Sequence, residues 1–317
     1  MILAVDGGNS KTDVALVADD GSLLAHARGP LSSPHHLGLD GCVSVLQSLV
    51  DATGLNGRRA ELAQLLLAGV DFPDEEDALR AAVEERGWAA RTLVGNDTFA
   101  VLRAGSDRGW GIAITCGAGM NCVGVGPDGR HVRFPALGHI TGDWGGGFDV
   151  GLAALGAAVR SEDGRGPKTM LEHAVPAHFA RSSPVELARD FHERRIAQTR
   201  LVELAPLVMS ASAEDGVAAS IVARLVEEIV ALVRAAAARL DLDEAEVLLG
   251  GGLMRGARDE VIEQIAAALG DRLVLRRPNA PPIVGAALLA LDAVGATDEA
   301  RLRAREQLTA AVDGEET

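Results

Sequence analysis

Residues 2–12 read ILAVDGGNSKT and are followed at once by DVALV at 13–17. Apolar runs on both sides of a glycine turn predict two strands that form a hairpin. An Asp-Asp-Gly turn signal at 19–21 then leads to a third strand at 22–27. We therefore expect the chain to begin with three antiparallel strands.

The turn between the first two strands carries the groups that a polyphosphate needs. Gly7 and Gly8 lack a Cβ, so backbone N–H groups there can approach an anion closely. Two hydroxyl groups and a positive charge follow directly, from Ser10, Lys11 and Thr12. The sequence predicts a phosphate-binding turn.

Asp6, at the end of the first strand, could hold a Mg²⁺ ion through water. The alternative for this stretch is a glycine-rich hairpin without a ligand, because short glycine motifs often match by chance. A strand rather than a helix follows the turn, and G-x-x-x-x-G-K-[ST] is absent. These two observations exclude a Walker A loop and a Rossmann fingerprint.

The composition indicates a folded protein large enough for two domains. The chain has 317 residues, of which 48% are hydrophobic and 24% charged, with a net charge of −15. Such a surface should repel nucleic acid and anionic membranes, and no apolar run reaches membrane-spanning length. The chain starts with a predicted strand and shows no secretion signal. Its three cysteines, Cys42, Cys116 and Cys122, have no CxxC spacing. Both observations predict a cytoplasmic protein.

The layout of residues 2–27 recurs in the middle of the chain. A strand at 110–115, a glycine turn at 116–120 and a strand at 121–126 precede another Asp-Gly turn. An internal repeat of this kind predicts a duplicated fold. Its two glycine turns could face one another across a cleft and hold one nucleotide.

A third glycine segment follows a predicted strand at 246–249. It consists of Gly250, Gly251 and Gly252 and leads into a helix. Close backbone approach at this position would suit the base and ribose of a nucleotide.

Two polar segments are candidates for the chemistry. Asp97 follows a predicted strand that starts at residue 91, and open α/β sheets place reactive groups at such strand ends. A helix N-cap is the alternative interpretation of Asp97. Residues 136–151 contain six glycines together with His139 and Asp143, which favours a binding loop over a core element.

His35 and His36 lie in a predicted loop at 29–38. Adjacent residues on a strand point to opposite faces, so a solvated or substrate-facing loop is favoured over a metal site. Residues 170–245 are predicted to be almost wholly helical, with a long amphipathic core helix at 218–240.

The three glycine segments, in this order, resemble those of the sugar kinase, heat-shock chaperone and actin superfamily. Within it, the chain resembles the N-acetylglucosamine kinase branch of the BadF/BadG/BcrA/BcrD ATPase family. The resemblance implies an α/β fold of two duplicated ribonuclease-H-like (actin-like ATPase) domains with an interdomain cleft. The matches are residues 6–12 with the first phosphate motif, 117–122 with the second (usually G-T-G-S-N-C), 138–143 with the G-H-x-x-G-D-E-G sugar loop and 250–252 with the adenosine motif.

The resemblance also implies a role for each matching residue. Asp97 would be the catalytic base that takes the proton of the sugar 6-hydroxyl group, and Asp6 would hold a hydrated Mg²⁺ ion. The sugar would contact Ser33, Asp97, Asn121, Gly138, His139 and Asp143. ATP would contact Gly7, Gly8, Ser10, Lys11, Thr12, Gly117, Gly119, Gly250, Gly251, Gly252 and Arg255.

Three positions depart from the family pattern. Ala118 replaces the usual Thr, so one phosphate hydroxyl group is missing, and Thr115 is a candidate replacement. Trp144 replaces the usual Glu after Asp143, and Ser33 stands where relatives carry a sugar-binding Asn. These changes bear on which sugar is bound more than on kinase activity.

The expected domains are an N-terminal lobe at 1–104 and a larger C-terminal lobe at 105–284. A helix at about 285–297 would return to the first lobe, and 298–317 would form a charged peripheral tail.

The expected function is that of a hexosamine kinase that uses ATP and Mg²⁺. N-acetylglucosamine is expected first, with glucosamine or another hexosamine as alternatives, and a homodimer is a possible assembly. One rival is a BadF-type activator ATPase with an iron–sulfur cluster, for which the three cysteines are poorly placed. The other is a non-catalytic sugar sensor, although no helix-turn-helix precedes Ile2.

Overall fold

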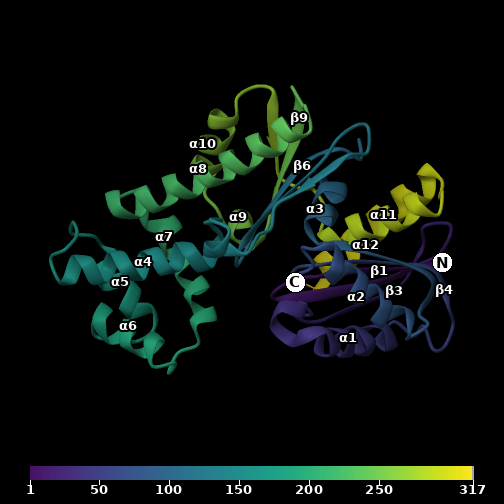
Figure 1. Cartoon of the computed structure of the whole chain (residues 1–317), viewed down its shortest axis with the longest axis horizontal. Coiled ribbons are helices and arrows are strands. Elements are labelled where there is room, and N and C mark those ends of the chain that lie inside the picture. Colours follow the sequence, from purple (N-terminus) through teal and green to yellow (C-terminus); the bar gives the residue numbers. More distant parts are fainter. Residues whose placement is uncertain (316–317) are drawn as a thin grey trace. The chain divides into compact units, whose positions relative to one another are not determined.

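The computed structural model describes residues 1–315, whose strands form two five-stranded sheets (Figure 1). The first sheet has the strand order β3-β2-β1-β4-β5. β2 pairs antiparallel with β1 and β3, whereas β4 pairs parallel with β1 and β5. The bounds are β1 Ile2–Gly7, β2 Lys11–Val17, β3 Leu23–Pro30, β4 Ala60–Leu67 and β5 Ala89–Asn96.

The second sheet has the order β10-β9-β6-β7-β8. Taken from the other end, β8-β7-β6-β9-β10 matches β3-β2-β1-β4-β5 of the first sheet strand for strand. β7 pairs antiparallel with β8, as β2 does with β3. The predicted α/β fold with an internal duplication is therefore confirmed. The bounds are β6 Gly111–Cys116, β7 Met120–Val125, β8 His131–Arg133, β9 Ala245–Gly250 and β10 Leu273–Arg276.

Helices connect and follow the strands. The first of them begins at Pro34, inside the predicted loop, and is interrupted at Gly38, where φ is +68°. The α-helices are α1 Pro34–Ala52, α2 Pro73–Glu84, α3 Thr98–Gly105, α4 Gly146–Glu162, α5 Leu171–His178, α6 Pro184–His192, α7 Ala205–Ala211, α8 Gly216–Arg239, α9 Gly252–Arg255, α10 Asp259–Leu269, α11 Pro282–Ala293 and α12 Asp298–Glu315. The 3₁₀-helices are η1 Gly138–Ile140 and η2 Gln198–Leu204.

The chain divides into two compact units. The first comprises Met1–Ala113, Val123–Pro135 and the chain from Arg276 onward, and the second comprises Ile114–Cys122 and Ala136–Leu275. In the first unit, alternate residues of β1 enter two different core clusters, as strand geometry requires. One cluster includes side chains of α1 and α2, and the other includes side chains of α3, α11 and α12.

The carboxyl ends of three strands lie at one edge of the first sheet. Gly7 of β1 is level with Leu67 of β4, and Leu67 is level with Asn96 of β5. The residues that follow these strands therefore emerge together. They are the turn after Gly7, the segment 68–72 and Asp97.

The segment from Asp298 differs from the predicted peripheral tail, because α12 is part of the core of the first unit. Ala300, Ala304, Leu308 and Val312 recur at four-residue intervals and are all buried. The last three belong to the same core cluster as α11. The many charged residues of this segment hide a narrow apolar stripe on one helix face.

In the second unit, α8 is the long core helix that the sequence predicts. Its buried residues include Ile221, Leu225, Ile229 and Val233 along one face. Asp215 caps its start, since the carboxylate Oδ1 accepts the N–H groups of the first turn at 2.9 Å. Among the described residues, no helix combines the length and the apolar character that a membrane crossing requires.

Candidate functional site

The turn between β1 and β2 is tight and open to solvent. Gly8 N–H donates to the carbonyl oxygen of Lys11 at 2.8 Å, and Ser10 is exposed at the tip. Thr12 is buried instead, and its Oγ1 donates to Ser32 Oγ at 2.8 Å. Ser10 can therefore meet a phosphate, whereas the Thr12 hydroxyl group supports the turn from inside.

Asp6 lies directly opposite Asp13 in the β1–β2 ladder, so the two side chains share a face. The buried Asp13 carboxylate accepts from Arg28 Nε at 2.7 Å and lies 2.9 Å from His26 Nε2. Burial alone would raise the pKa of Asp13, but the hydrogen bonds from His26 and Arg28, with the charges of Arg28 and Lys11, hold it below its ordinary value. Beside Asp6, the structure thus places an ionised carboxylate balanced by cations.

Asp97 occupies the N-cap position of α3, yet its carboxylate does not cap the helix. Asn96 does this instead, because its Oδ1 accepts the N–H of Thr98 at 2.9 Å. The main-chain N–H of Asp97 donates to Leu67 O at 3.3 Å, which fixes the residue against the end of β4. The N-cap interpretation of the Asp97 side chain is therefore wrong.

The surroundings of Asp97 change its proton affinity. Its side chain is half-buried, and Thr98 Oγ1 lies 3.4 Å from Oδ1. Burial, and then the negative charge of Asp71, raise the pKa of Asp97 to about 7. A carboxyl group that titrates near neutrality at a strand end can accept and release a proton.

Asp71 and Asn96 were not predicted as site residues. Asp71 comes shortly after β4, as Asp97 comes directly after β5. The same sequence pattern, a carboxylate that follows a buried strand, therefore also indicates Asp71. Asp71, Glu75 and His35 also have potential ligand atoms within 4.8 Å of one another. Glu75 Oε2 accepts the N–H of Asp71 at 2.7 Å and that of the next residue at 3.0 Å. This group is a hydrogen-bonded helix cap, and it does not include His36.

Two buried hydroxyl groups have no hydrogen-bond partner among residues 1–315, namely Ser33 Oγ and Thr115 Oγ1. An unsatisfied buried hydroxyl group costs free energy, so it marks a place where a ligand atom can complete the bonding. Ser33 lies at the N-cap position of α1, beside Gly69, where an added Cβ would be 2.6 Å from Ser33 Oγ. Thr115 lies near the end of β6.

In the second unit, the turn between β6 and β7 is held by backbone contacts. Gly117 N–H donates to Gly119 O at 2.9 Å, and Gly147 N–H donates to Gly117 O at 2.7 Å. Gly146 has φ of +73°, and a Cβ there would lie 2.4 Å from Gly119 O. Asn121 follows on β7, and its Oδ1 accepts the N–H of Cys122 at 2.7 Å.

The predicted adenosine segment packs against the end of β6. Gly251 has φ of +96°, and a Cβ there would lie 2.3 Å from Cys116 O, so only glycine fits. Gly250 ends β9, Gly252 begins α9, and Arg255 is exposed at the end of that helix. The second unit thus brings the Gly117 turn and the Gly250 segment together, since a Cβ on Gly117 would lie 3.8 Å from Gly252 N.

The predicted sugar loop is held by its own hydrogen bonds. Asp143 N–H donates to Gly138 O at 3.0 Å, and Thr141 Oγ1 donates to Asp143 Oδ2 at 2.5 Å. His139 lies between them in η1 and is exposed. The Asp143 carboxylate therefore has a defined orientation.

Trp144 follows Asp143 and contacts α8. The guanidinium carbon of Arg224 lies 4.1 Å from the centroid of the Trp144 ring, a cation–π arrangement. The Trp144 ring thus holds the positive charge of Arg224 next to the predicted sugar loop.

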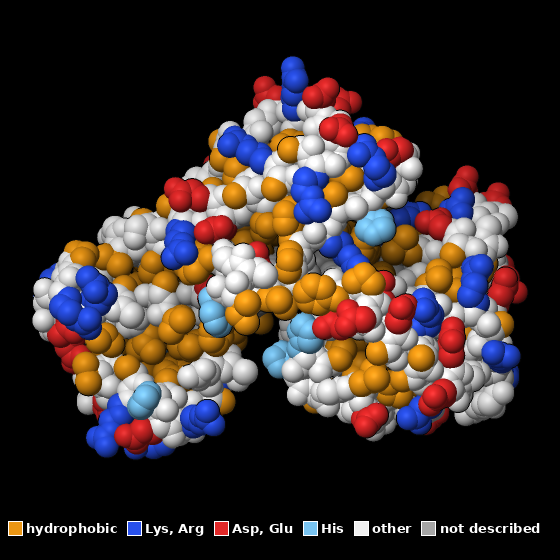
Figure 2. All heavy atoms as spheres, in the orientation of Figure 1, with side chains coloured by type: hydrophobic (Ala, Val, Ile, Leu, Met, Phe, Trp, Pro, Cys, Tyr) orange, Lys and Arg blue, Asp and Glu red, His pale blue; other side chains and the backbone are white. Residues whose placement is uncertain are grey.

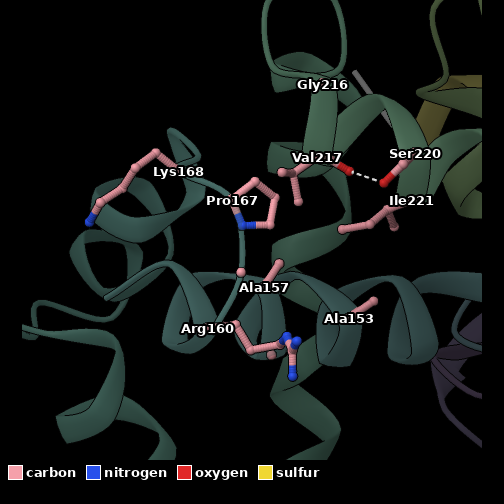
Figure 3. Close-up of a pocket in the computed structure, with 11 residues that line it drawn as sticks. Ala153, Ala157, Arg160, Pro167, Lys168, Gly216, Val217, Ser220 and Ile221 are labelled. Atoms are coloured by element: carbon pink, nitrogen blue, oxygen red, sulfur yellow. Dashed lines mark hydrogen bonds between the residues drawn. The ribbon is translucent and has the colours of Figure 1, made fainter. Parts of the chain in front are cut away.

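A pocket of about 650 Å³ lies elsewhere in the second unit, between α4, the loop at 166–168 and the start of α8 (Figure 3). Pro167, Val217 and Ile221 lie around it, whereas the amino group of Lys168 points away (Figure 3). Lys168 Nζ donates to Ser161 O at 3.0 Å. No predicted sugar or nucleotide residue lines this pocket, so it is separate from the candidate site.

Acidic and basic side chains alternate on the face shown in Figure 2. Acidic residues outnumber basic ones by 45 to 30 in the chain as a whole.

Comparison with known proteins shows relatives that match most of this chain. An N-acetylmuramic acid/N-acetylglucosamine kinase of Clostridium acetobutylicum is 28% identical over 261 residues, which are 80% of this chain and 85% of the relative. An N-acetyl-D-glucosamine kinase of Dictyostelium discoideum is 24% identical over 318 residues, covering 92% of this chain and 98% of the relative.

A similar solved structure comes from Chromobacterium violaceum and is provisionally named an N-acetylglucosamine kinase. It has a TM-score of 0.73 and 27% identity, and the match covers 91% of this chain and 98% of that protein. Residues 3–290, which run from β1 into α11, also match the sequence model of one protein family. This protein therefore belongs to the BadF/BadG/BcrA/BcrD ATPase family.

Proposed function

We propose that this protein transfers a phosphoryl group from ATP to the 6-hydroxyl group of N-acetylglucosamine. The observation that carries the proposal is Asp97, a half-buried carboxyl group at the edge of the first sheet with a pKa of about 7. Membership of an ATPase family supports ATP as the donor. The names of the two curated relatives support an N-acetylated hexosamine as the acceptor.

Asp97 would act as the general base. Phosphoryl transfer requires little covalent help from the protein, so positioning and charge stabilisation dominate, with one carboxylate that accepts the nucleophile's proton. Each glycine turn would donate to phosphate oxygens from the main-chain N–H groups of its exposed residues, which are Ser10 in the first unit and Ala118 and Gly119 in the second. Thr115 Oγ1, buried without a partner in the described chain, is a candidate replacement for the hydroxyl group missing at Ala118.

Asp6 would hold Mg²⁺ through water. Its side chain is half-exposed at the end of β1, where an oxygen ligand suits a hydrated divalent ion. The neighbouring carboxylate of Asp13 is balanced by Arg28. When bound, the ion would neutralise charge on the phosphates. Mg²⁺ use is part of the proposal.

The sugar contacts follow the sequence prediction. Ser33 is supported by its buried hydroxyl group, which lacks a partner among residues 1–315, and Asp143 by its fixed orientation. The roles of Asn121, Gly138 and His139 stay predictions. So do the remaining nucleotide contacts, namely Gly7, Gly8, Lys11, Thr12, Gly250, Gly251, Gly252 and Arg255.

N-acetylmuramic acid is a second candidate substrate. It carries a carboxylate on its 3-O-lactyl group, and Arg224 brings a positive charge to Trp144, next to Asp143. The curated relative from Clostridium acetobutylicum is named for both sugars. Arg224→Gln should therefore reduce turnover of N-acetylmuramic acid selectively if this sugar is bound.

The test is an ADP-release assay with a panel of N-acetylglucosamine, N-acetylmuramic acid, glucosamine and glucose, with and without Mg²⁺. Asp97→Asn should lower kcat by about 10²–10⁴-fold and leave the sugar Kd, measured calorimetrically, nearly unchanged. Asp77→Asn is the matched control, because Asp77 is exposed on α2 and pairs with Arg80.

Wild-type turnover in the Asp97→Asn variant would show that Asp97 is not the base. ATP hydrolysis without any sugar would favour the activator function, and sugar binding without turnover would favour the sensor. A cytoplasmic location is proposed from the three free, buried cysteines. A homodimer stays a proposal that the mass in solution would test.

A further inference from the structure

The side chain of Asn96 connects Asp71 to Thr98, the residue that follows Asp97. Asn96 Nδ2 donates to Asp71 Oδ1 at 2.8 Å, while Asn96 Oδ1 accepts the N–H of Thr98 at 2.9 Å. Asn96 therefore joins the Asp71 carboxylate to the first residue of α3. Asp97 lies between the two residues that make this connection, so its backbone is held at a fixed distance from Asp71.

Asp71 is itself held in place by α2. Its N–H donates to Glu75 Oε2 at 2.7 Å, and Glu75 Oε1 lies 3.2 Å from His35 Nε2. Burial alone would raise the pKa of Glu75, but the hydrogen bonds from Asp71 N–H, His35 and Phe72 N–H keep it below its ordinary value. An ionised Glu75 therefore anchors the Asp71 backbone, while the Asp71 carboxylate accepts a hydrogen bond from Asn96.

Several other charged groups occur on the elements around α3 and β5. Two of them have a counter-charge close by: Glu76 of α2 pairs with Arg133 of β8, and Arg103 of α3 lies 2.8 Å from Asp292 of α11. His35 of α1, Glu75 of α2 and Asp6 of β1 are further titratable groups on these elements. After burial, the negative charge of Asp71 is the next cause of the raised pKa of Asp97.

We propose that Asp71 is a positioning residue that, through Asn96, sets the pH range in which Asp97 can act as the base. The inference rests on the proposed role of Asp97. A negative charge nearby makes it harder to ionise Asp97 but makes the ionised form a stronger base. With Asp71 nearby, the enzyme would thus be less active at low pH, while the ionised Asp97 carboxylate would have a higher proton affinity near neutral pH.

The proposed step is the transfer of the γ-phosphoryl group of ATP to the sugar. The sugar 6-oxygen forms a bond to the γ-phosphorus of ATP, and the bond from that phosphorus to the β–γ bridging oxygen breaks. The 6-hydroxyl proton moves to an Asp97 carboxylate oxygen, and ADP leaves. Asp97 must be ionised at the start, so kcat/KM for the sugar should rise with pH until the pH exceeds about 7.

The experiment is a pH profile of kcat/KM from pH 5 to 9 for wild type, Asp71→Asn, Asp71→Glu and Asp77→Asn. Asp71→Asn keeps the acceptor for Asn96 but removes the charge, so the acidic limb should move down by about one pH unit. At pH 6, activity relative to the plateau should then rise about five-fold, from roughly a tenth ionised to roughly half. Asp71→Glu and Asp77→Asn should keep the wild-type limb.

An acidic limb that stays in place in a folded Asp71→Asn protein would overturn the inference. If the asparagine variant does not fold, Asp71→Ser gives the same neutral comparison. Asp97→Asn separates this result from the proposed function, because its residual rate should have no such limb. If Asp97→Asn keeps both the wild-type rate and the limb, the proposed role of Asp97 fails first.

Discussion

Gly151 and Gly156 offer the same substitution on one helix with opposite expected effects. Both lie inside α4, and glycine at such positions weakens a helix by roughly 0.5–1 kcal/mol relative to alanine. Gly156 is exposed, and a Cβ there would have nothing within 4 Å. Gly156→Ala should therefore increase the free energy of unfolding by about that amount.

Gly151 faces η2 instead. A Cβ there would lie 1.9 Å from Leu201 O and 2.8 Å from Leu201 C. Both are backbone atoms, so no side-chain rotation relieves the overlap, and α4 must move by about 1.5 Å to reach ordinary contact. Overpacking of this kind costs about 1–3 kcal/mol or more, which exceeds the gain in helix propensity.

Thermal unfolding of the two variants measures this difference. With about 2–4 °C of Tm per kcal/mol for a domain of this size, Gly156→Ala should raise Tm by about 1–4 °C. For Gly151→Ala, the overpacking cost less the gain in helix propensity leaves a loss of about 0.5–2 kcal/mol, so Tm should fall by about 1–8 °C. A Gly151→Ala protein as stable as wild type, or two variants that shift in the same direction, would refute the packing argument.

Two further substitutions test the first unit. Gly285→Ala places a Cβ 1.9 Å from Ala100 O on α3, which begins directly after Asp97. Both Tm and kcat should therefore fall, and an unchanged kcat in a folded variant would show that α3 does not position the base. Ser33→Ala removes a buried hydroxyl group without a partner in the described chain, so Tm should stay within about 1 °C while the KM for the sugar rises. A lower Tm with unchanged KM would assign Ser33 a structural role.

Local sequence determined the framework of the fold. Strand alternation, Asp-Gly turns and three glycine segments depend on neighbouring residues, so their order was sufficient to predict two equivalent sheets. The strand orders β3-β2-β1-β4-β5 and β8-β7-β6-β9-β10 confirm that duplication. Asp97 was also identifiable, because a carboxylate that directly follows a buried strand is a local pattern.

Charge, burial and close contact depended on residues far apart in the chain. The proton affinity of Asp97 depends on burial and on Asp71, which comes from a different strand end. Thr12 turned inward because Ser32, 20 residues later, accepts its hydrogen bond. Gly151 requires glycine because Leu201 lies against it.

The sequence by itself determined where strands and turns would be and pointed to Asp97 as a candidate, since those features follow from the order of adjacent residues. Only the tertiary structure decided that α12 joins the core and that Asn96, not Asp97, caps α3. It also decided that the buried hydroxyl groups of Ser33 and Thr115 have no hydrogen-bond partner among residues 1–315. The physical reason is that solvation and electrostatic energies depend on every group within a few ångströms, and distant segments supply most of those groups.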